Sequence, residues 1–247
     1  MSNIYPLAIR FADLWAIDHH QMVDEIYAPE IHMESMCWLD HAAVESGAEL
    51  HDLEDRLAAM IPAHRHELVR VTASSRHACL ETTVVSPTTG EYGPACVWWW
   101  LDGNGQVADE VGFFDWPRRT TDCRTSHGTV LANDGRCRAD GVESVVDALR
   151  RGSLGELLAP GGSVELVALG PGRVPTSPVA VQEIVADGNV VAALVVGRDG
   201  DSIWRDTIVV SLGTDDRIAS LRHYRDPQAR FAPDAVHPSI RLDPRRR

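Results

Sequence analysis

The sequence contains no lysine, so all 23 basic residues of this 247-residue chain are arginines, against 36 acidic residues. The resulting formal net charge of −13 repels phosphate backbones, and we therefore expect no nucleic-acid partner. No apolar run approaches the roughly 18 residues that a membrane-spanning helix needs, so no membrane partner is expected. The first residues lack a basic stretch followed by an apolar one, which predicts no secretory signal.

Cysteine is scarce, and its spacing matches no metal site. The five cysteines form no CxxC pair, which favours a reducing compartment and excludes a zinc knuckle. We therefore expect a cytoplasmic protein. His64 and His66 share one face of a strand, but no further ligands follow at a set spacing. A Gly-rich phosphate loop and a nucleophile elbow are also missing, so we expect neither a metal nor an organic cofactor.

What the sequence does contain is an internal repeat. The Ala-Pro dipeptide at 28–29 and the later Glu34 return as 159–160 and Glu165, at an offset of 131 residues. The segments from Leu101 to Asp115 and from Leu212 to Asp226 have the same length, at an offset of 111. Because these landmarks keep their order, the pattern predicts a tandem duplication whose second copy is about 20 residues shorter.

Hydrophobic periodicity predicts helices and strands in both copies. The first copy opens with a helix whose apolar stripe runs from Ala8 to Ile26, and a second helix spans 50–61 between a Ser46–Glu49 capping box and Pro62. The second copy has one helix, which ends at Gly152, and a loop at 170–175. Strands are predicted at 68–71, 77–85, 96–101 and 107–116, and at 179–185, 190–196, 207–212 and 218–224.

These elements predict two domains. The first covers residues 1–116, a polar linker covers 117–140, the second and shortened domain covers 141–231, and a tail covers 232–247.

This element order resembles the nuclear-transport-factor-2-like fold in its SnoaL-like branch. The resemblance is carried by FADLWAIDHHQMVDEIYAPEIHMES at 11–35 and VWWWLDGNGQVADEVGFFDW at 97–116, and by LLAPGGSVEL at 157–166 and IASLRHYRDP at 218–227. It implies an α+β protein of two tandem cone-shaped domains, each a curved antiparallel sheet wrapped on helices around an apolar pocket, with a degenerate second copy. Such folds include polyketide cyclases, ketosteroid isomerases, epoxide hydrolases, dehydratases and non-catalytic binders, so the fold leaves the reaction open.

The site motifs of two such enzymes are missing. The ketosteroid isomerase base would fall on Ser35 and its oxyanion acid near Val97, and neither residue is an acid. The Arg-x-Asp pair of limonene-epoxide hydrolases is missing from strand 77–85, and the last-strand acid falls near Gly112 or His223. An epoxide hydrolase of that kind remains only a further alternative.

The candidate catalytic residues are acids on apolar strands: Glu81, Glu110 and Asp115. A carboxylate on a covered strand is costly unless it is paired, hydrogen-bonded or protonated, and burial raises its pKa toward the range useful for acid–base catalysis. The alternative is that these acids form ordinary structural ion pairs or end a strand.

The predicted substrate-binding residues are Trp15, Trp99, His32 and Phe114. Alternation sends Trp99 to the pocket face of its strand and Trp98 and Trp100 to the other face. Aromatic walls suit a flat apolar ligand, although each tryptophan taken singly is more often explained by ordinary core packing.

Together these features predict an enzyme that acts by acid–base chemistry on a small hydrophobic metabolite such as a polyketide, terpenoid or steroid. A cyclase, an isomerase or a hydratase/dehydratase would fit. The alternative is a non-catalytic small-ligand-binding or assembly module.

A last expectation concerns the strands of the second copy. Residues 190–196 and 208–210 are apolar without alternation, which is typical of sheets covered on both faces. We therefore expect an intramolecular pseudo-dimer in which the two sheets pack around Trp98 and Trp100, and a homodimer is left open. A fragment ending near Arg119 should then self-associate.

Overall fold

The computed structural model describes residues 4–37, 43–114, 139–167, 170–171, 173–199 and 202–225. The chain divides into two compact units, Met1–Ala132 and Asn133–Arg247. Each unit is described by itself, as unit 1 and unit 2.

Two helices open unit 1 where the sequence predicts one. Helix α1 spans Ile4–Ile17 and α2 spans His19–Ile26. Asp18 separates them because its backbone is extended and its side chain accepts a hydrogen bond from the Gln21 N–H at 2.9 Å. The apolar stripe is nevertheless continuous, since Phe11, Trp15 and Met22 are all buried. An N-cap residue inside a helical pattern thus changes the direction of the chain without changing which face is buried.

The third helix of unit 1 begins and ends close to where the sequence predicts. Helix α3 spans Gly47–Met60, and Ser46 caps it by accepting from the Glu49 N–H. The Glu49 carboxylate accepts from the Glu45 N–H at 2.7 Å, one residue before the capping-box position. Leu50, Leu53 and Leu57 are the buried leucines of this helix.

The sheet of unit 1 is mixed rather than antiparallel. Its strands are β1 (Tyr27–Cys37), β2 (Ala43–Val44), β3 (Arg65–Ala73), β4 (His77–Val85), β5 (Tyr92–Leu101) and β6 (Val107–Phe114), in the order β2-β1-β6-β5-β4-β3. Strands β3 to β6 pair antiparallel as predicted, whereas β1 pairs parallel to β6. The prediction of an antiparallel sheet is therefore wrong at this pairing. A parallel pair needs a long connection, which here runs through α3 and four strands, β2 to β5.

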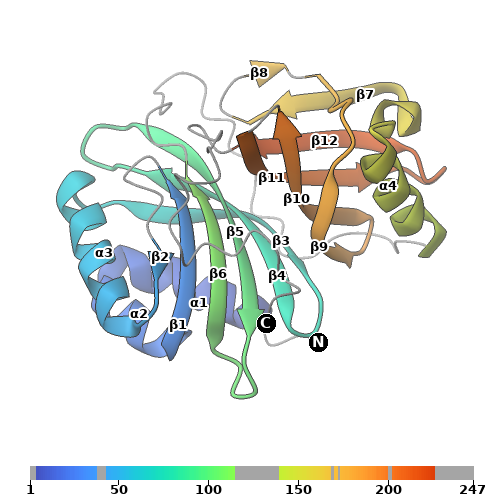
Figure 1. The fold of residues 1–247 in the computed structure, drawn as a ribbon. Coiled ribbons are helices and arrows are strands. Elements are labelled where there is room, and N and C mark those ends of the chain that lie inside the picture. The colour runs from blue at the N-terminus through green and yellow to red at the C-terminus, as the bar shows by residue number, and fades with distance from the viewer. Residues whose placement is uncertain are drawn as a thin grey trace. The chain divides into compact units, whose positions relative to one another are not determined.

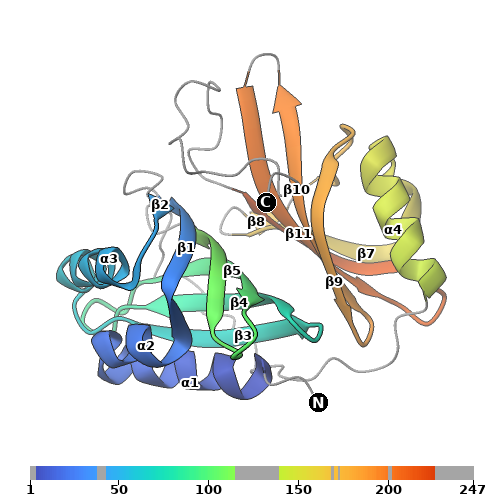
Figure 2. The same cartoon turned by 60° about the horizontal axis from the view of Figure 1, so that its bottom comes forward.

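The helices of unit 1 lie on one face of this curved sheet (Figure 1), and Figure 2 shows α1 beside β3. The core between the helices and the sheet contains Trp15, Trp99 and Val107 together with leucines of α3. Trp98 and Trp100 instead stack on each other, with ring centroids 6.1 Å apart. The predicted alternation of the three tryptophans is thus confirmed.

Unit 2 has one α-helix among its described residues, α4 (Ala139–Arg151), followed by the short 3-10 helix η2 (Leu154–Leu157). Its strands are β7 (Leu158–Leu166), β8 (Gly170–Pro171), β9 (Ala180–Asp187), β10 (Val190–Asp199), β11 (Ser202–Leu212) and β12 (Ile218–Arg225), in the order β8-β7-β12-β11-β10-β9. Helix α4 lies on one face of this sheet (Figure 1). The predicted loop at 170–175 contains the two-residue strand β8, which pairs with the end of β7.

The two sheets agree in strand order and in register. The parallel pair β1–β6 sets Met33 opposite Glu110, and the parallel pair β7–β12 sets Val164 opposite Leu221. Val164 and Leu221 follow Met33 and Glu110 at the offsets of 131 and 111 residues read from the sequence. Positions of unit 2 can therefore be compared one by one with those of unit 1.

Helix α4 ends at Gly152 as predicted, and this glycine provides a test of unit 2. The φ of Gly152 is +69°, and a Cβ there would lie 2.4 Å from the Thr176 carbonyl oxygen. We expect Gly152→Ala to destabilise the protein by more than the about 1–2 kcal/mol of a left-handed non-glycine residue, measured by calorimetry. Gly161→Ala is the control, because Gly161 has φ +78° and open space around its Cβ position. Equal losses in the two variants would contradict this account.

None of the helices in the described part of the chain is long and apolar enough to cross a membrane.

Candidate functional site

The most unusual side chain of the unit 1 core is the carboxyl group of Glu110 on β6. It is 4% exposed, and its Oε2 atom accepts two hydrogen bonds, from the Tyr27 hydroxyl at 2.7 Å and from Trp99 Nε1 at 2.8 Å. Tyr27 begins β1 and Trp99 lies on β5, so the two strands that flank β6 each supply one donor. Both donors are neutral, and within the described residues no arginine or histidine pairs with Glu110.

The second oxygen of Glu110 is free for another partner. Among the residues that the structure describes, Oε1 makes no hydrogen bond. The neighbour on its side of the strand is Gly112, where an added Cβ would lie 3.5 Å from Oε1. The absence of a side chain at residue 112 therefore leaves room beside the oxygen that has no partner.

A second buried carboxyl group, that of Glu54, faces the same interior from α3. Its Oε2 accepts a hydrogen bond of 2.6 Å from Trp15 Nε1, and the residue is 4% exposed. Burial raises the pKa of Glu54, and the nearby charge on Glu110 raises it further. Both buried carboxyl groups thus face the core of unit 1, and one oxygen of each accepts a hydrogen bond from an indole N–H.

Aromatic rings connect the two carboxyl groups. Phe11 lies between the two indoles, with its ring centroid 5.8 Å from that of Trp15 and 5.2 Å from that of Trp99. His64, which precedes β3, and His66, on β3, also contact the Trp15 ring, and His66 contacts Phe11 as well. His64 Nδ1 lies 2.7 Å from the Ile61 carbonyl oxygen and must donate to it, so Nε2 is the acceptor nitrogen of the neutral ring.

Burial sets the ionisation of these groups. It raises the pKa of Glu110 to about 7, against the lowering effect of the Tyr27 and Trp99 hydrogen bonds. It also raises the pKa of Glu54 to about 8 and of Tyr27 well above its ordinary value. Burial lowers the pKa of His66 well below its usual range, and His64 nearby adds to this effect. At neutral pH Glu110 therefore populates both its protonated and its ionised form, while Tyr27 and His66 stay neutral.

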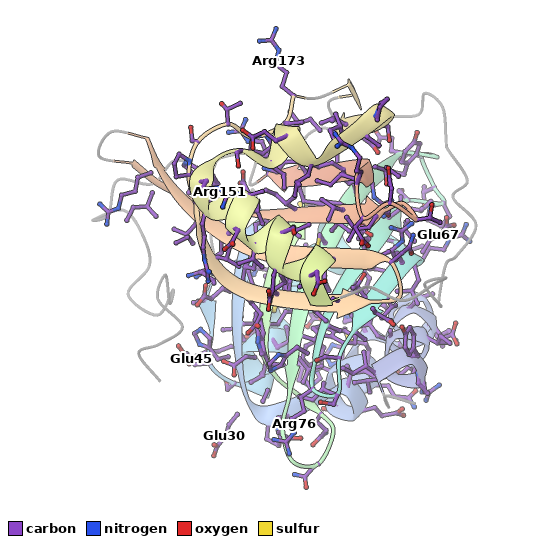
Figure 3. The ribbon with its side chains drawn as sticks, turned by 90° about the vertical axis from the view of Figure 1, so that its right-hand side faces the viewer. Glu30, Glu45, Glu67, Arg76, Arg151 and Arg173 are labelled. Atoms are coloured by element: carbon purple, nitrogen blue, oxygen red, sulfur yellow. The ribbon has the colours of Figure 1, made fainter. Side chains whose placement is uncertain are left out.

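Most charged side chains in the part of the chain that the structure describes are placed differently. Glu30, Glu45 and Arg76 are exposed, and Figure 3 shows them projecting from the ribbon. A buried carboxyl group without a cation is costly, because an ionised group loses its hydration when it leaves water. Exposed charged side chains mainly keep a protein soluble, whereas Glu54 and Glu110 are buried and are for this reason candidates for acid–base chemistry.

The structure brings together three of the seven predicted site residues: Trp15, Trp99 and Glu110. Two others lie on the opposite face of the sheet. Glu81 alternates with core residues of β4 and lies 4.0 Å from Arg70 Nε, and His32 alternates with core residues of β1 and contacts Glu34 and Glu45. The backbone of Phe114 ends β6, but its side chain is not described. Asp115 lies outside the described residues.

Tyr27 and Glu54 are site residues that the sequence patterns did not predict. A signal existed for Glu54, which lies four residues after Leu50 and three before Leu57, on the apolar stripe of α3. An acid at such a position is buried when the helix docks. Tyr27 gave no such signal, because its hydroxyl reaches Glu110 only through the parallel pairing of β1 and β6, in which Tyr27 itself lies opposite Val107.

Unit 2 has none of this chemistry at the equivalent positions. The counterparts of Tyr27, Trp99 and Glu110 are Leu158, Val210 and Leu221. Val210 and Leu221 are paired, as Trp99 and Glu110 are, and both belong to the core of unit 2.

No protein-family model matches the chain, and no curated protein matches it. Many solved structures do match, over less than half of the chain. A SnoaL-like protein of unknown function from Burkholderia thailandensis is 11% identical, with a TM-score of 0.40, and the match covers 47% of this chain and 98% of that one. A hypothetical protein with a ketosteroid isomerase-like fold from Catenulispora acidiphila, in complex with trimethylamine, is 11% identical, with a TM-score of 0.40 and coverages of 47% and 88%. A proposed SnoaL-like polyketide cyclase from Jannaschia sp. is 17% identical, with a TM-score of 0.39 and coverages of 44% and 83%.

Proposed function

We propose that unit 1 is a cofactor-independent acid–base enzyme in which Glu110 transfers a proton to or from a small, largely apolar molecule. The observation that carries this proposal is the state of Glu110. One oxygen is anchored by Tyr27 and Trp99, the other has no partner among the described residues, and the pKa of about 7 suits transfer in either direction near neutral pH.

Each neighbour of Glu110 has a part in this proposal. The two hydrogen bonds to Oε2 orient the carboxyl group, so that Oε1 is the atom that meets the substrate. The rings of Phe11, Trp15 and Trp99 provide apolar contact area, and Glu54 is a second group within the same interior. Cyclases, isomerases and hydratases or dehydratases all need such a proton transfer, and the comparisons with isomerase-like and cyclase-like structures are consistent with this range.

We further propose that the chain is a tandem pair of SnoaL-like domains in which only the first carries the reaction. The matching strand order and registers support the duplication. Leu158, Val210 and Leu221 can neither accept nor donate a proton, so unit 2 lacks the groups that the reaction needs.

Blocking the space beside Glu110 should prevent binding without removing the acid. We expect hydrophobic metabolites from a panel of polyketides, terpenoids and steroids to raise the melting temperature of the wild-type chain. A ligand at about 100 times its Kd stabilises the folded state by about 2.7 kcal/mol. In Gly112→Val the added methyl groups occupy the space beside Oε1, and this stabilisation should disappear. The exposed Gly103, which has open space around it, provides the control variant Gly103→Ala. Ligands that stabilise Gly112→Val as strongly as the wild type would place the binding site elsewhere.

A non-catalytic binding module is the second candidate. The hydrogen bonds from indole groups to both carboxyl groups favour it, because such static contacts also stabilise a purely structural core. A ligand that binds beside Gly112 but is never converted, at any pH, would support this role over catalysis.

A further inference from the structure

A cluster of histidine and aspartate side chains lies on the surface of unit 1, where α2 meets α3. His19 and His20 stand in the first turn of α2, and Asp55 lies on α3. The Nε2 atoms of both histidines are 2.8 Å from the same atom, Oδ1 of Asp55. The ligand atoms of all three side chains lie within 4.8 Å of one another. The acid–base proposal uses none of these groups.

Two more residues extend the cluster with helical spacing. His51 precedes Asp55 by four residues on α3, and Asp24 follows His20 by four on α2, so each helix presents a pair on one face. His51 Nε2 lies 3.0 Å from Asp24 Oδ1, and the His51 ring stacks on the His20 ring with centroids 4.6 Å apart. The outer pair thus fixes the orientation of the His20 ring toward Asp55.

This arrangement is more suited to a metal ion than to hydrogen bonds alone. For both imidazoles to donate to one carboxylate oxygen, both Nε2 atoms must carry a proton that points at the same acceptor. A divalent cation would replace the two protons and bind both nitrogens and the oxygen together. Two imidazole nitrogens and one carboxylate form a ligand set typical of zinc and of neighbouring first-row transition metals, whereas magnesium and calcium prefer oxygen ligands throughout.

We propose that His19, His20 and Asp55 form a binding site for a divalent first-row transition metal ion, with His51 and Asp24 as positioning residues. The Asp55 and His20 side chains are about half exposed, at 55% and 50%, so an ion can enter from solvent and water can complete its coordination. Ligand distances of about 2.0–2.2 Å require only small rotations of these side chains. The ion connects the start of α2 to the middle of α3, and its role is to stabilise unit 1.

Titration calorimetry with ZnCl₂ tests the site, using the full chain without a histidine tag after treatment with EDTA and dialysis. We expect one zinc ion per chain and a rise in melting temperature on binding. Asp55→Asn and His20→Ala should each weaken binding at least tenfold, and His51→Ala should weaken it less. His77→Ala, a part-exposed histidine of β4 outside the cluster, is the matched control and should bind zinc like the wild type.

A measurement on the wild type alone keeps the test independent of whether the variants fold. Co²⁺ bound by two imidazoles and a carboxylate should give visible absorption bands that magnesium does not abolish and zinc does. If the wild type binds zinc no more tightly than Asp55→Asn does, or if Co²⁺ gives no such bands, the cluster is a set of ion pairs only and the proposal is overturned. Neither result bears on Glu110, so the proposed metal site and the proposed acid–base site are tested independently of each other.

Discussion

Replacing Glu110 with glutamine is expected to lower the turnover of the substrate by about 10²–10⁴-fold while unit 1 stays folded. Glutamine has nearly the same shape, and its carbonyl oxygen can still accept from Tyr27 and Trp99. It cannot exchange a proton near neutral pH. The measurement is the rate of conversion of whichever panel compound stabilises the wild type, with circular dichroism to verify folding. In the wild type, kcat/KM should change with an apparent pKa of about 7, rising with pH if Glu110 acts as a base and falling if it acts as an acid.

Glu81→Gln is the matched control for this experiment. Glu81 is also a buried carboxyl group on a central strand of the same sheet, but it lies on the opposite face beside Arg70. Its substitution should leave kcat/KM within a few-fold of the wild-type value. If Glu81→Gln abolishes turnover and Glu110→Gln does not, the reaction takes place on the other face and Glu110 has only a structural role.

The second large effect is on the pH dependence of stability. Burial raises the pKa of Glu110 from 4.5 to about 7, so the folded state binds more protons than the unfolded state between these values. The free energy of unfolding must therefore fall as pH rises through this window. A shift of about 2.5 pH units corresponds to about 3 kcal/mol, present in full below pH 4.5 and lost above pH 7. Glu110→Gln removes this dependence because glutamine does not titrate.

Urea unfolding at several pH values, followed by tryptophan fluorescence, measures this effect. All seven tryptophans except Trp204 belong to unit 1, so the signal reports mainly on that unit. The difference in unfolding free energy between the wild type and Glu110→Gln cancels the contributions of titrating groups that do not interact with Glu110, and it keeps the coupling of Glu110 to Glu54. That difference should change by about 3 kcal/mol between pH 4.5 and pH 8. A difference that does not vary with pH would mean that Glu110 has an ordinary pKa and that solvent reaches it.

The equivalent positions of unit 2 explain why these acids are informative. Leu221 and Val210 of unit 2 lie opposite each other on paired strands and are buried, as Glu110 and Trp99 are in unit 1. The fold therefore accepts apolar residues where unit 1 has Glu110 and Trp99. Keeping a buried carboxyl group at such a position costs stability at neutral pH, and for this reason the proposed proton transfer is assigned to Glu110.

Local patterns were sufficient for much of the fold. The β4 boundaries His77–Val85, the α3 cap at Ser46 and the C-terminal glycine of α4 all follow from side-chain alternation and capping chemistry within a few residues. The break at Asp18 was missed, because an apolar stripe continues through it and periodicity does not detect a change of helix direction. The parallel pairing of β1 and β6 was also missed, since strand direction depends on a long connection and not on any local signal.

By itself the sequence determined most of the element types, the repeat with its two offsets, and the inward direction of Trp15 and Trp99, because burial of one face gives the chain a periodic pattern of apolar residues. Only the tertiary structure decided which of these groups meet. Tyr27 and Glu110 are 83 residues apart, and Trp15 and Glu54 are 39 apart, yet each pair is hydrogen-bonded. Such contacts are set by strand register and helix docking, which depend on the packing of the whole unit. The same holds for pKa values, since burial by distant segments is what raises that of Glu110.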